Sequence, residues 1–310
     1  MPQRDVTIQT ADGPMDASLH TPDVGDGTWP AVIMYPDAGG LRPVMREMGQ
    51  KLADYGYVVI VPNPFYRSGP FEPFDMQTAF TDEGERKRLF GLIGSVTKDG
   101  SGRDTEAMLA FLTEQPEVTP GSKVGTTGYC MGGGLSLNAA GRFGDRIGGA
   151  ASFHGGRLAT DAPDSPHRLA PSITARVYVG AARDDGSFDQ AQAEVMTEAF
   201  DAAGVGYELV WYDALHGWCM SDFPVYDKQA DELHWEAMTA LFGATLDPAD
   251  PDIGTETFDL DGDGKISMRE EAKARMGLFD ASLEERAEKG GITGKIAGAV
   301  HKLTDKLDND

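Results

Sequence analysis

Gly128-Tyr129-Cys130-Met131-Gly132-Gly133 is the stretch that decides the fold, because it has the pattern of a nucleophile elbow with cysteine in the place that serine usually holds. An elbow is a sharp strand-to-helix turn that lifts its central side chain above the sheet. Small residues are needed two before and two after the nucleophile, since a Cβ there would collide with the neighbouring strand or helix. Residues 123–127 have the pattern of a short buried strand, and residues 135–140 have that of the helix behind it.

The rest of the chain alternates between strand-like and helix-like segments. Six apolar runs have strand length: 31–35, 57–61, 124–127, 149–153, 175–179 and 207–212. Amphipathic stretches lie between most of them, at 43–55, 103–114, after Cys130, at 190–203 and at 226–242. This alternation predicts an α/β fold, in which a mostly parallel sheet has helices on both faces. A hairpin of residues 6–9 and 17–20 is expected before it, and two long connections, 63–102 and 154–174, leave the carboxyl ends of strands.

Length and charge limit the organisation and the partners. The 310 residues suffice for one large domain, expected at 1–246, and a small extension at 247–310. A formal net charge of −23 argues against nucleic acid or an anionic membrane as a partner. We expect a cytoplasmic protein, since no segment reads as a leader or a membrane span. Two cysteines, Cys130 and Cys219, indicate no disulfide framework, and a small buried apolar role is expected for Cys219.

A thiol at an elbow needs a base and an acid, which in α/β-hydrolases follow the nucleophile in the order acid, then histidine. His216 comes directly after the last predicted strand, where the base of such a triad stands. Asp184 and Asp185 follow the strand 175–179, and we favour Asp185 as the acid. The alternative for this acidic pair is that it only caps a turn.

These residue types favour acyl transfer through a covalent intermediate. A cysteine thiol with a pKa of about 8.5 is only a few per cent thiolate at neutral pH, and an imidazole held by a carboxylate supplies the missing basicity. Attack on an ester or lactone carbonyl then gives a thioester. The oxyanion is expected to be held by the N–H of Met131 and by one from the loop 37–40, contributed by Ala38 or Gly39.

These motifs resemble the dienelactone hydrolase family, whose members are small α/β-hydrolases with a Cys-Asp-His triad that open lactone and ester bonds. The resemblance covers roughly residues 5–245. It rests on four segments: the elbow 128–133, Gly180-Ala181-Ala182-Arg183-Asp184-Asp185, His216-Gly217-Trp218 and Phe153-His154-Gly155-Gly156. It implies Cys130 as the nucleophile, Asp185 as the acid and His216 as the base.

The resemblance also implies substrate-binding residues. In the family an acidic residue after the first buried strand pairs with the resting cysteine, and Asp37 is similar in position, one methylene shorter than the usual glutamate. Arg67 looks like one of two arginines that bind a substrate carboxylate, and Met220 stands where the second is expected. His154 follows the strand beside the nucleophile strand. It is either a substrate contact or a loop histidine bonded to backbone.

Residues 259–270 match a calcium-binding EF-hand loop. Oxygen ligands are expected from six positions, with Gly264 making the sharp turn: Asp259, Asp261, Asp263, Lys265 through its carbonyl, Ser267 and Glu270. The only cofactor expected is therefore structural Ca²⁺, with none for catalysis. EF-hands normally work in pairs, so this loop is either a lone clip or pairs with a copy in a homodimer. Residues 291–307 have the apolar spacing of a terminal helix.

The sequence leaves two classes of function open. The first is a hydrolase of small lactones or esters that uses a cysteine nucleophile and carries structural calcium. The second is a calcium-responsive binding protein on a hydrolase scaffold that recognises its ligand without turnover. The complete set of triad residue types favours the first, although fold and motif alone do not establish turnover.

The loop at 259–270 gives the first testable prediction. Calcium that binds only the folded chain should raise its melting temperature. The free energy of unfolding should rise by about 2.7 kcal/mol when the free ion exceeds the dissociation constant a hundredfold. Calorimetric titration should detect binding to the wild type and much weaker binding to Glu270→Gln, which loses the bidentate carboxylate. We expect little change in kcat. A strong calcium dependence of kcat would favour the regulatory alternative.

Overall fold

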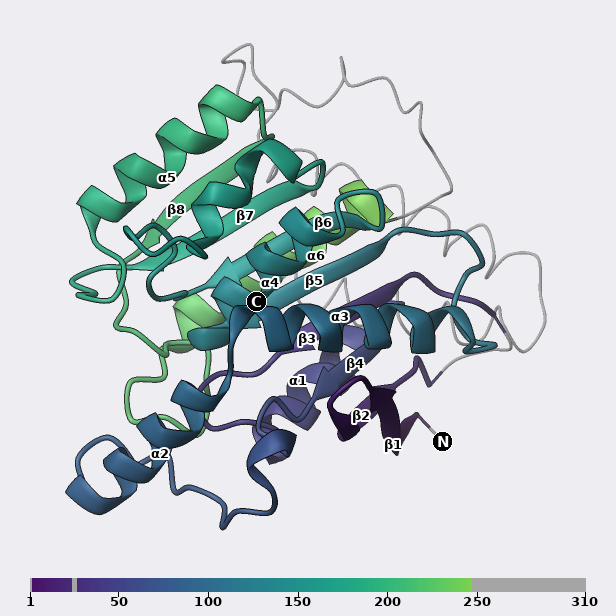
Figure 1. The fold of residues 1–310 in the computed structure, drawn as a ribbon, viewed down its shortest axis with the longest axis horizontal. Helices are drawn as coiled ribbons and strands as arrows, with labels where there is room; N and C mark the ends of the chain where they lie inside the picture. The colour runs from purple at the N-terminus through teal and green to yellow at the C-terminus, as the bar shows by residue number, and fades with distance from the viewer. Residues whose placement is uncertain (1, 24–26, 247–310) are drawn as a thin grey trace, which may run out of the picture.

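The computed structural model describes residues 2–23 and 27–246, and the predicted calcium loop and terminal helix lie outside these residues. Its centre is an eight-stranded sheet with the order β1-β2-β4-β3-β5-β6-β7-β8 (Figure 1). The strands are β1 (Gln3–Thr10), β2 (Gly13–His20), β3 (Ala31–Tyr35), β4 (Val58–Pro62), β5 (Val124–Tyr129), β6 (Ile147–Phe153), β7 (Arg176–Ala182) and β8 (Tyr207–Tyr212). β1 and β2 form the expected antiparallel hairpin, β2 pairs antiparallel with β4, and the neighbouring pairs from β4 to β8 are parallel.

The helices are α1 (Pro43–Asp54), α2 (Glu83–Ser95), α3 (Lys98–Thr113), α4 (Met131–Arg142), α5 (Gln190–Ala203) and α6 (Lys228–Leu246), with short 3₁₀ turns at Tyr66–Ser68 and Pro166–Ser172. The predicted α/β fold is therefore confirmed. Among the described residues, no helix has the length and apolar character needed to cross a membrane.

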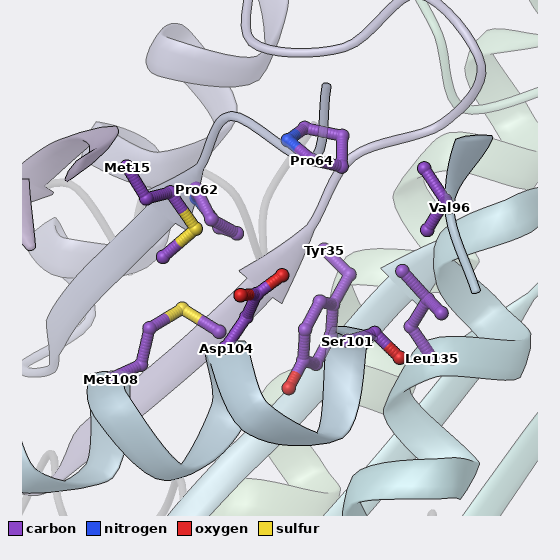
Figure 2. Close-up of a pocket in the computed structure, with 9 residues that line it drawn as sticks. All are labelled: Met15, Tyr35, Pro62, Pro64, Val96, Ser101, Asp104, Met108 and Leu135. Carbon is purple, nitrogen blue, oxygen red and sulfur yellow. The ribbon is translucent and has the colours of Figure 1, made fainter. Parts of the chain in front are cut away.

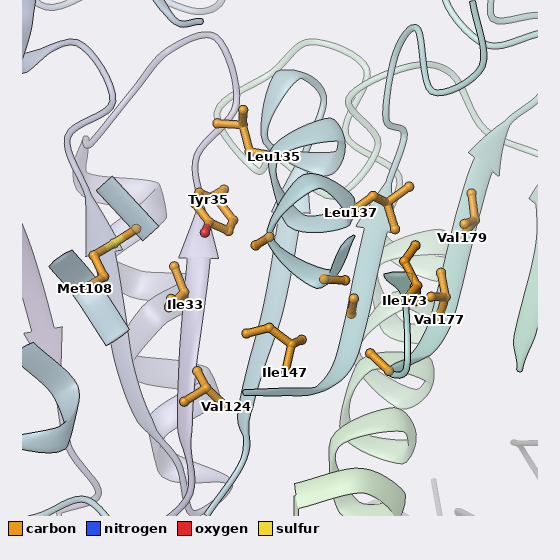
Figure 3. Packing of buried hydrophobic residues seen from close by; sticks show 14 of the residues in the cluster. Ile33, Tyr35, Met108, Val124, Leu135, Leu137, Ile147, Ile173, Val177 and Val179 are labelled. Carbon is orange, nitrogen blue, oxygen red and sulfur yellow. The ribbon is translucent and has the colours of Figure 1, made fainter. Parts of the chain in front are cut away.

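The alternation of side chains along each strand divides the core into two layers. On β3, Ile33 and Tyr35 pack with residues of α3, α4 and α5 on one face of the sheet (Figure 3). Val32 and Met34 pack on the other face, with residues of α1 and α6. All five side chains of β3 are buried, because a parallel strand covered on both sides exposes neither face to water. Both layers of helices hold the carboxyl edge of the sheet in place.

The connection 63–102 contains a helix that the sequence did not indicate. α2 buries only Leu89, so its sequence lacks the apolar stripe by which amphipathic helices are recognised. It is instead capped by Asp82, whose side chain accepts a hydrogen bond from the Glu85 N–H at 2.8 Å. α3 also starts earlier than expected, at Lys98, because Thr97 caps it in the same way by accepting from the Gly100 N–H.

The elbow forms between β5 and α4. Cys130 has a φ of 52°, which only a tightly constrained non-glycine residue adopts. A Cβ on Gly128 would lie 2.0 Å from the carbonyl oxygen of Gly132, and one on Gly132 would lie 2.3 Å from that of Tyr35. The two glycines are thus required sterically, as the sequence pattern indicated, because backbone atoms cannot give way to a methyl group.

We predict that Gly132→Ala strongly destabilises the protein, since its new methyl group meets the carbonyl oxygens of Tyr35 at 2.3 Å and Pro36 at 2.5 Å. Overpacking of this kind costs about 1–3 kcal/mol or more. Urea unfolding should report that loss. Gly91→Ala is the matched control, because no heavy atom lies within 4 Å of its new Cβ in α2, and an exposed helix gains up to about 1 kcal/mol from this change. Equal stability of Gly132→Ala and wild type would refute the steric account of the elbow.

Candidate active site

The predicted catalytic residues gather at the carboxyl edge of the sheet. Cys130 follows β5, Asp185 follows β7 and His216 follows β8, and these parallel strands end at the same edge of the sheet although they lie far apart in the sequence (Figure 1). Cys130 is partly exposed and in the free thiol form. The elbow therefore presents a reduced sulfur atom at the edge where ligands bind in open α/β sheets.

Asp185, rather than its neighbour, reaches the histidine. Its Oδ2 lies 2.6 Å from Nδ1 of His216, and its Oδ1 accepts a hydrogen bond of 2.8 Å from the Ser187 N–H. The Asp185 carboxylate is only 6 % exposed. Asp184 is exposed and has a left-handed φ of 56°. The two adjacent aspartates therefore differ in role: one is held against His216, and the other faces water in the turn.

The electrostatics of this pair favour an imidazole that holds a proton strongly. Burial lowers the pKa of His216, but hydrogen bonds to Asp185 and Cys130 outweigh burial and raise that pKa to about 10. Burial raises the pKa of Asp185, but the hydrogen bonds from His216 and Ser187 lower it below its ordinary value. With Nδ1 directed at the carboxylate, Nε2 is the nitrogen left for the thiol. An imidazole placed in this way can accept the proton of Cys130.

Two backbone amides are positioned to stabilise an oxyanion. Met131 is the first residue of α4, so its N–H has no acceptor within the helix. In the loop after β3, the N–H groups of Gly39 and Gly40 are used internally, since they donate to the side chain and the carbonyl of Asp37. Ala38, by contrast, makes no such hydrogen bond through its N–H within the described chain. Of the two loop residues considered from sequence, Ala38 is the one with a free donor.

Asp37 has a different partner from the one expected. Its side chain is fully buried and forms two hydrogen bonds with the guanidinium of Arg42, of 2.5 Å at Oδ1 and 2.9 Å at Oδ2. Arg42 also binds both carboxylate oxygens of Asp222, at 2.7 and 3.0 Å. This network ties the loop after β3 to the loop that follows His216. Asp37 thus fixes the loop that contains Ala38, and Arg42, which the sequence analysis did not single out, is the residue that links it to Asp222.

Arg67 also belongs to an internal network. Its guanidinium binds both oxygens of Asp104 at 2.8 and 2.7 Å and Asp12 at 2.6 Å, and donates to the carbonyl of Gly100. The Asp104 carboxylate lines a small cavity between α3 and the ends of β3 and β4 (Figure 2). The residues around that cavity do not include Cys130, Asp185 or His216. All three guanidinium nitrogens are engaged by carboxylates, so a substrate anion would have to compete with Asp12 and Asp104 for Arg67.

The other residues considered from sequence are buried. His154 is fully enclosed, and its Nδ1 accepts a hydrogen bond from the Cys130 N–H, which favours the backbone-bonded alternative over a substrate contact. Met220 is fully buried and Cys219 nearly so, as expected for an apolar filler. Across residues 2–23 and 27–246, no group of three or more potential metal-ligating side chains is present.

The chain is similar to known proteins over most of its length. A model of the dienelactone hydrolase family matches residues 15–246. The chain is 28% identical over 219 residues to a carboxymethylenebutenolidase of a Pseudomonas species, covering 70% of this chain and 85% of that protein. It is 26% identical over 209 residues to a carboxymethylenebutenolidase of Pseudomonas putida, covering 67% of this chain and 82% of that protein.

Solved structures of related proteins have a similar fold. A crystal structure from Klebsiella pneumoniae, described as a candidate dienelactone hydrolase, superposes with a TM-score of 0.68 at 22% identity, covering 77% of this chain and 97% of that one. A dienelactone hydrolase-like promiscuous phosphotriesterase from metagenomic libraries superposes with a TM-score of 0.63 at 26% identity, covering 80% of this chain and 100% of that one.

The contacts of Arg67 give a prediction that separates a structural role from substrate binding. Arg67→Ala should lower the melting temperature, because it leaves the carboxylate of Asp104 without its cation, and each kcal/mol lost corresponds to roughly 2–4 °C in a domain of this size. KM should change by the same factor for acidic and for neutral esters. Arg103→Ala is the control, since Arg103 pairs with Asp12 from a more exposed position. A selective rise of KM for acidic esters would restore the role implied by the family.

Proposed function

The chain belongs to the dienelactone hydrolase family, and from that premise we propose that it hydrolyses small ester or lactone bonds with Cys130 as the nucleophile. The observation that carries the proposal is the 2.6 Å contact between Asp185 and the Nδ1 of His216, beside a free thiol raised on an elbow. A structural cysteine needs no such base. An acyl-transfer site needs a nucleophile, a base and a group that orients the base.

In the proposed reaction, Nε2 of His216 takes the thiol proton and the sulfur attacks the carbonyl carbon. The negative charge that develops on the carbonyl oxygen is held by the N–H groups of Met131 and Ala38. His216 then returns the proton to the leaving alkoxide, which gives an alcohol and a thioester on Cys130. Water, deprotonated by the same imidazole, attacks the thioester carbonyl, the C–S bond breaks and the acid leaves, and His216 returns the proton to the sulfur of Cys130. Asp185 keeps the imidazole in the required tautomer throughout.

Two positions at which the family has substrate-binding arginines indicate whether the substrate carries a carboxylate. Met220 is buried where the second arginine is expected, and Arg67 is held by Asp12 and Asp104. We therefore propose that esters and lactones without a carboxylate are accepted at least as well as acidic ones. The two Pseudomonas relatives are named for the hydrolysis of a carboxymethylenebutenolide, a lactone with a carboxyl group, so the chain is proposed to share their reaction type rather than their substrate.

We further propose that residues 259–270 bind calcium and that the ion stabilises the protein without entering the reaction. The support is the ligand pattern of the loop alone. A protein in which calcium controls ligand binding without turnover remains the second candidate, and the reactivity of the thiol separates the two. An activated thiol is alkylated far faster than free cysteine at neutral pH, whereas an inert scaffold thiol is not.

The test is hydrolysis of p-nitrophenyl esters and simple lactones by the wild type and four variants. Cys130→Ala and His216→Ala should each lower kcat by about ten-thousandfold or more, because nucleophile and base act as a unit. Asp185→Asn should retain weak activity. Asp184→Asn is its matched control and should behave like wild type, because that carboxylate is exposed.

Two results would count against the proposal. Near-wild-type rates in Cys130→Ala would exclude the thiol as nucleophile. A wild-type thiol that reacts with iodoacetamide no faster than free cysteine, together with no turnover of any ester or lactone, would favour the binding protein. If Asp184→Asn rather than Asp185→Asn abolished activity, the acid would be wrongly assigned while the nucleophile stood.

A further inference from the structure

His154 occupies a strained position next to the nucleophile. β5 and β6 pair in parallel through Tyr129 and Phe153, so Cys130 and His154 are the next residues at the ends of neighbouring strands. Both have left-handed backbones, with φ of 52° for Cys130 and 38° for His154. Strain of this kind in non-glycine residues persists only where the surroundings enforce it, and it gathers at functional sites.

The imidazole of His154 is bonded to the nucleophile residue itself. Its Nδ1 accepts a hydrogen bond of 3.1 Å from the N–H of Cys130, which is shared with the carbonyl of Phe153 at the same distance. A nitrogen that accepts carries no proton, so the neutral ring has its proton on Nε2. The side chain is 0% exposed, and its Nε2 has no hydrogen-bond partner among the described residues.

The same ring also touches the catalytic base. It meets the ring of His216 at 4.9 Å between centroids and that of Trp218 at 5.1 Å, both edge to face. Burial lowers the pKa of His154 well below its ordinary value, and the facing imidazoles of His216 and His234 lower it further. Tyr129, whose ring lies 6.1 Å away, faces it from β5. His154 is therefore held in its neutral form beside the ring of His216.

We propose that His154 is a positioning residue, whose Nδ1 holds the amide of Cys130 so that the thiol keeps its place against His216. This inference rests on the proposed function, because it assigns a support to the same nucleophile. Cys130 follows β5 and His216 follows β8, and His154 follows β6, one of the two strands between them, in contact with both residues.

The energetics favour a functional reason for this histidine. A buried N–H without a partner costs stability, and an apolar ring of similar shape would avoid that cost. The chain keeps a histidine in spite of the cost. Histidine supplies a hydrogen-bond acceptor at Nδ1, which phenylalanine lacks. Asparagine supplies it too, because its Oδ1 is attached to Cγ as Nδ1 is in histidine, and it tolerates a left-handed φ.

Two variants, His154→Phe and His154→Asn, separate the acceptor from the packing of the ring. The phenylalanine variant keeps the ring against His216 and Trp218, loses the acceptor and removes the unpartnered N–H. Because phenylalanine tolerates the left-handed φ of 38° less well than histidine, these effects oppose one another and its melting temperature should stay close to that of wild type. Its kcat should fall roughly ten- to hundredfold with KM nearly unchanged, since a shift of a reacting group by about 1 Å can cost 10² in rate. The alkylation rate of Cys130 by iodoacetamide should fall with kcat.

The asparagine variant should show the opposite order. It loses ring contacts and melts lower, yet its kcat at 25 °C should stay within a few-fold of wild type and above that of His154→Phe. If His154→Phe is as active as wild type, or more active than His154→Asn, the ring only packs and the inference is wrong. Cys130→Ala separates the proposed nucleophile from the proposed role of His154. If the Cys130→Ala protein remains active, the proposed function itself fails, whatever the His154 variants do.

Discussion

The site depends on the close approach of Gly132 to the carbonyl oxygens of Tyr35 and Pro36, where no side chain can fit. This contact brings the first turn of α4 against the end of β3. It thereby sets the N–H of Met131 beside the loop that contains Ala38, so one steric condition aligns both candidate oxyanion donors. The same turn raises Cys130 from the end of β5. The candidate donors and the nucleophile are thus positioned by backbone packing.

Costs in stability are concentrated around this contact. Cys130, His154 and Asp184, all at carboxyl ends of central strands, have left-handed backbones, and His154 buries an unpartnered Nε2. The remainder of the sheet offsets these costs through ordinary burial: all residues of β3, β4, β5 and β6 are enclosed by helices. Residues that break the usual preferences for backbone conformation or hydrogen bonding, in an otherwise well-packed protein, are expected mainly at functional sites. His154 is the clearest case, because an apolar ring there would satisfy the core better.

What could be predicted from sequence followed from local patterns, and what could not required tertiary contacts. Buried parallel strands are continuous apolar runs, so the sheet was found, and the order of nucleophile, acid and histidine pointed to Asp185 and His216. The helix α2 was missed because it buries only Leu89. Arg42 was missed because nothing local indicates that its guanidinium binds Asp37 and also Asp222, which lies 180 residues further along the chain. Arg67 was found by its motif, but its partners Asp12 and Asp104 come from distant segments, so its role could not be deduced from the motif.

The excess of carboxylates gives these arginine contacts a common cause. With 50 acidic and 27 basic residues, a guanidinium near the site is more readily paired with a carboxylate of the chain than left free for a ligand. Arg42 bridges two aspartates and Arg67 bridges two others. An anionic substrate would have to compete with these bidentate pairs and approach against the net negative field of the protein. A neutral ester or lactone meets neither obstacle, so the charge balance of the whole chain and the local contacts at the site favour the same class of substrate.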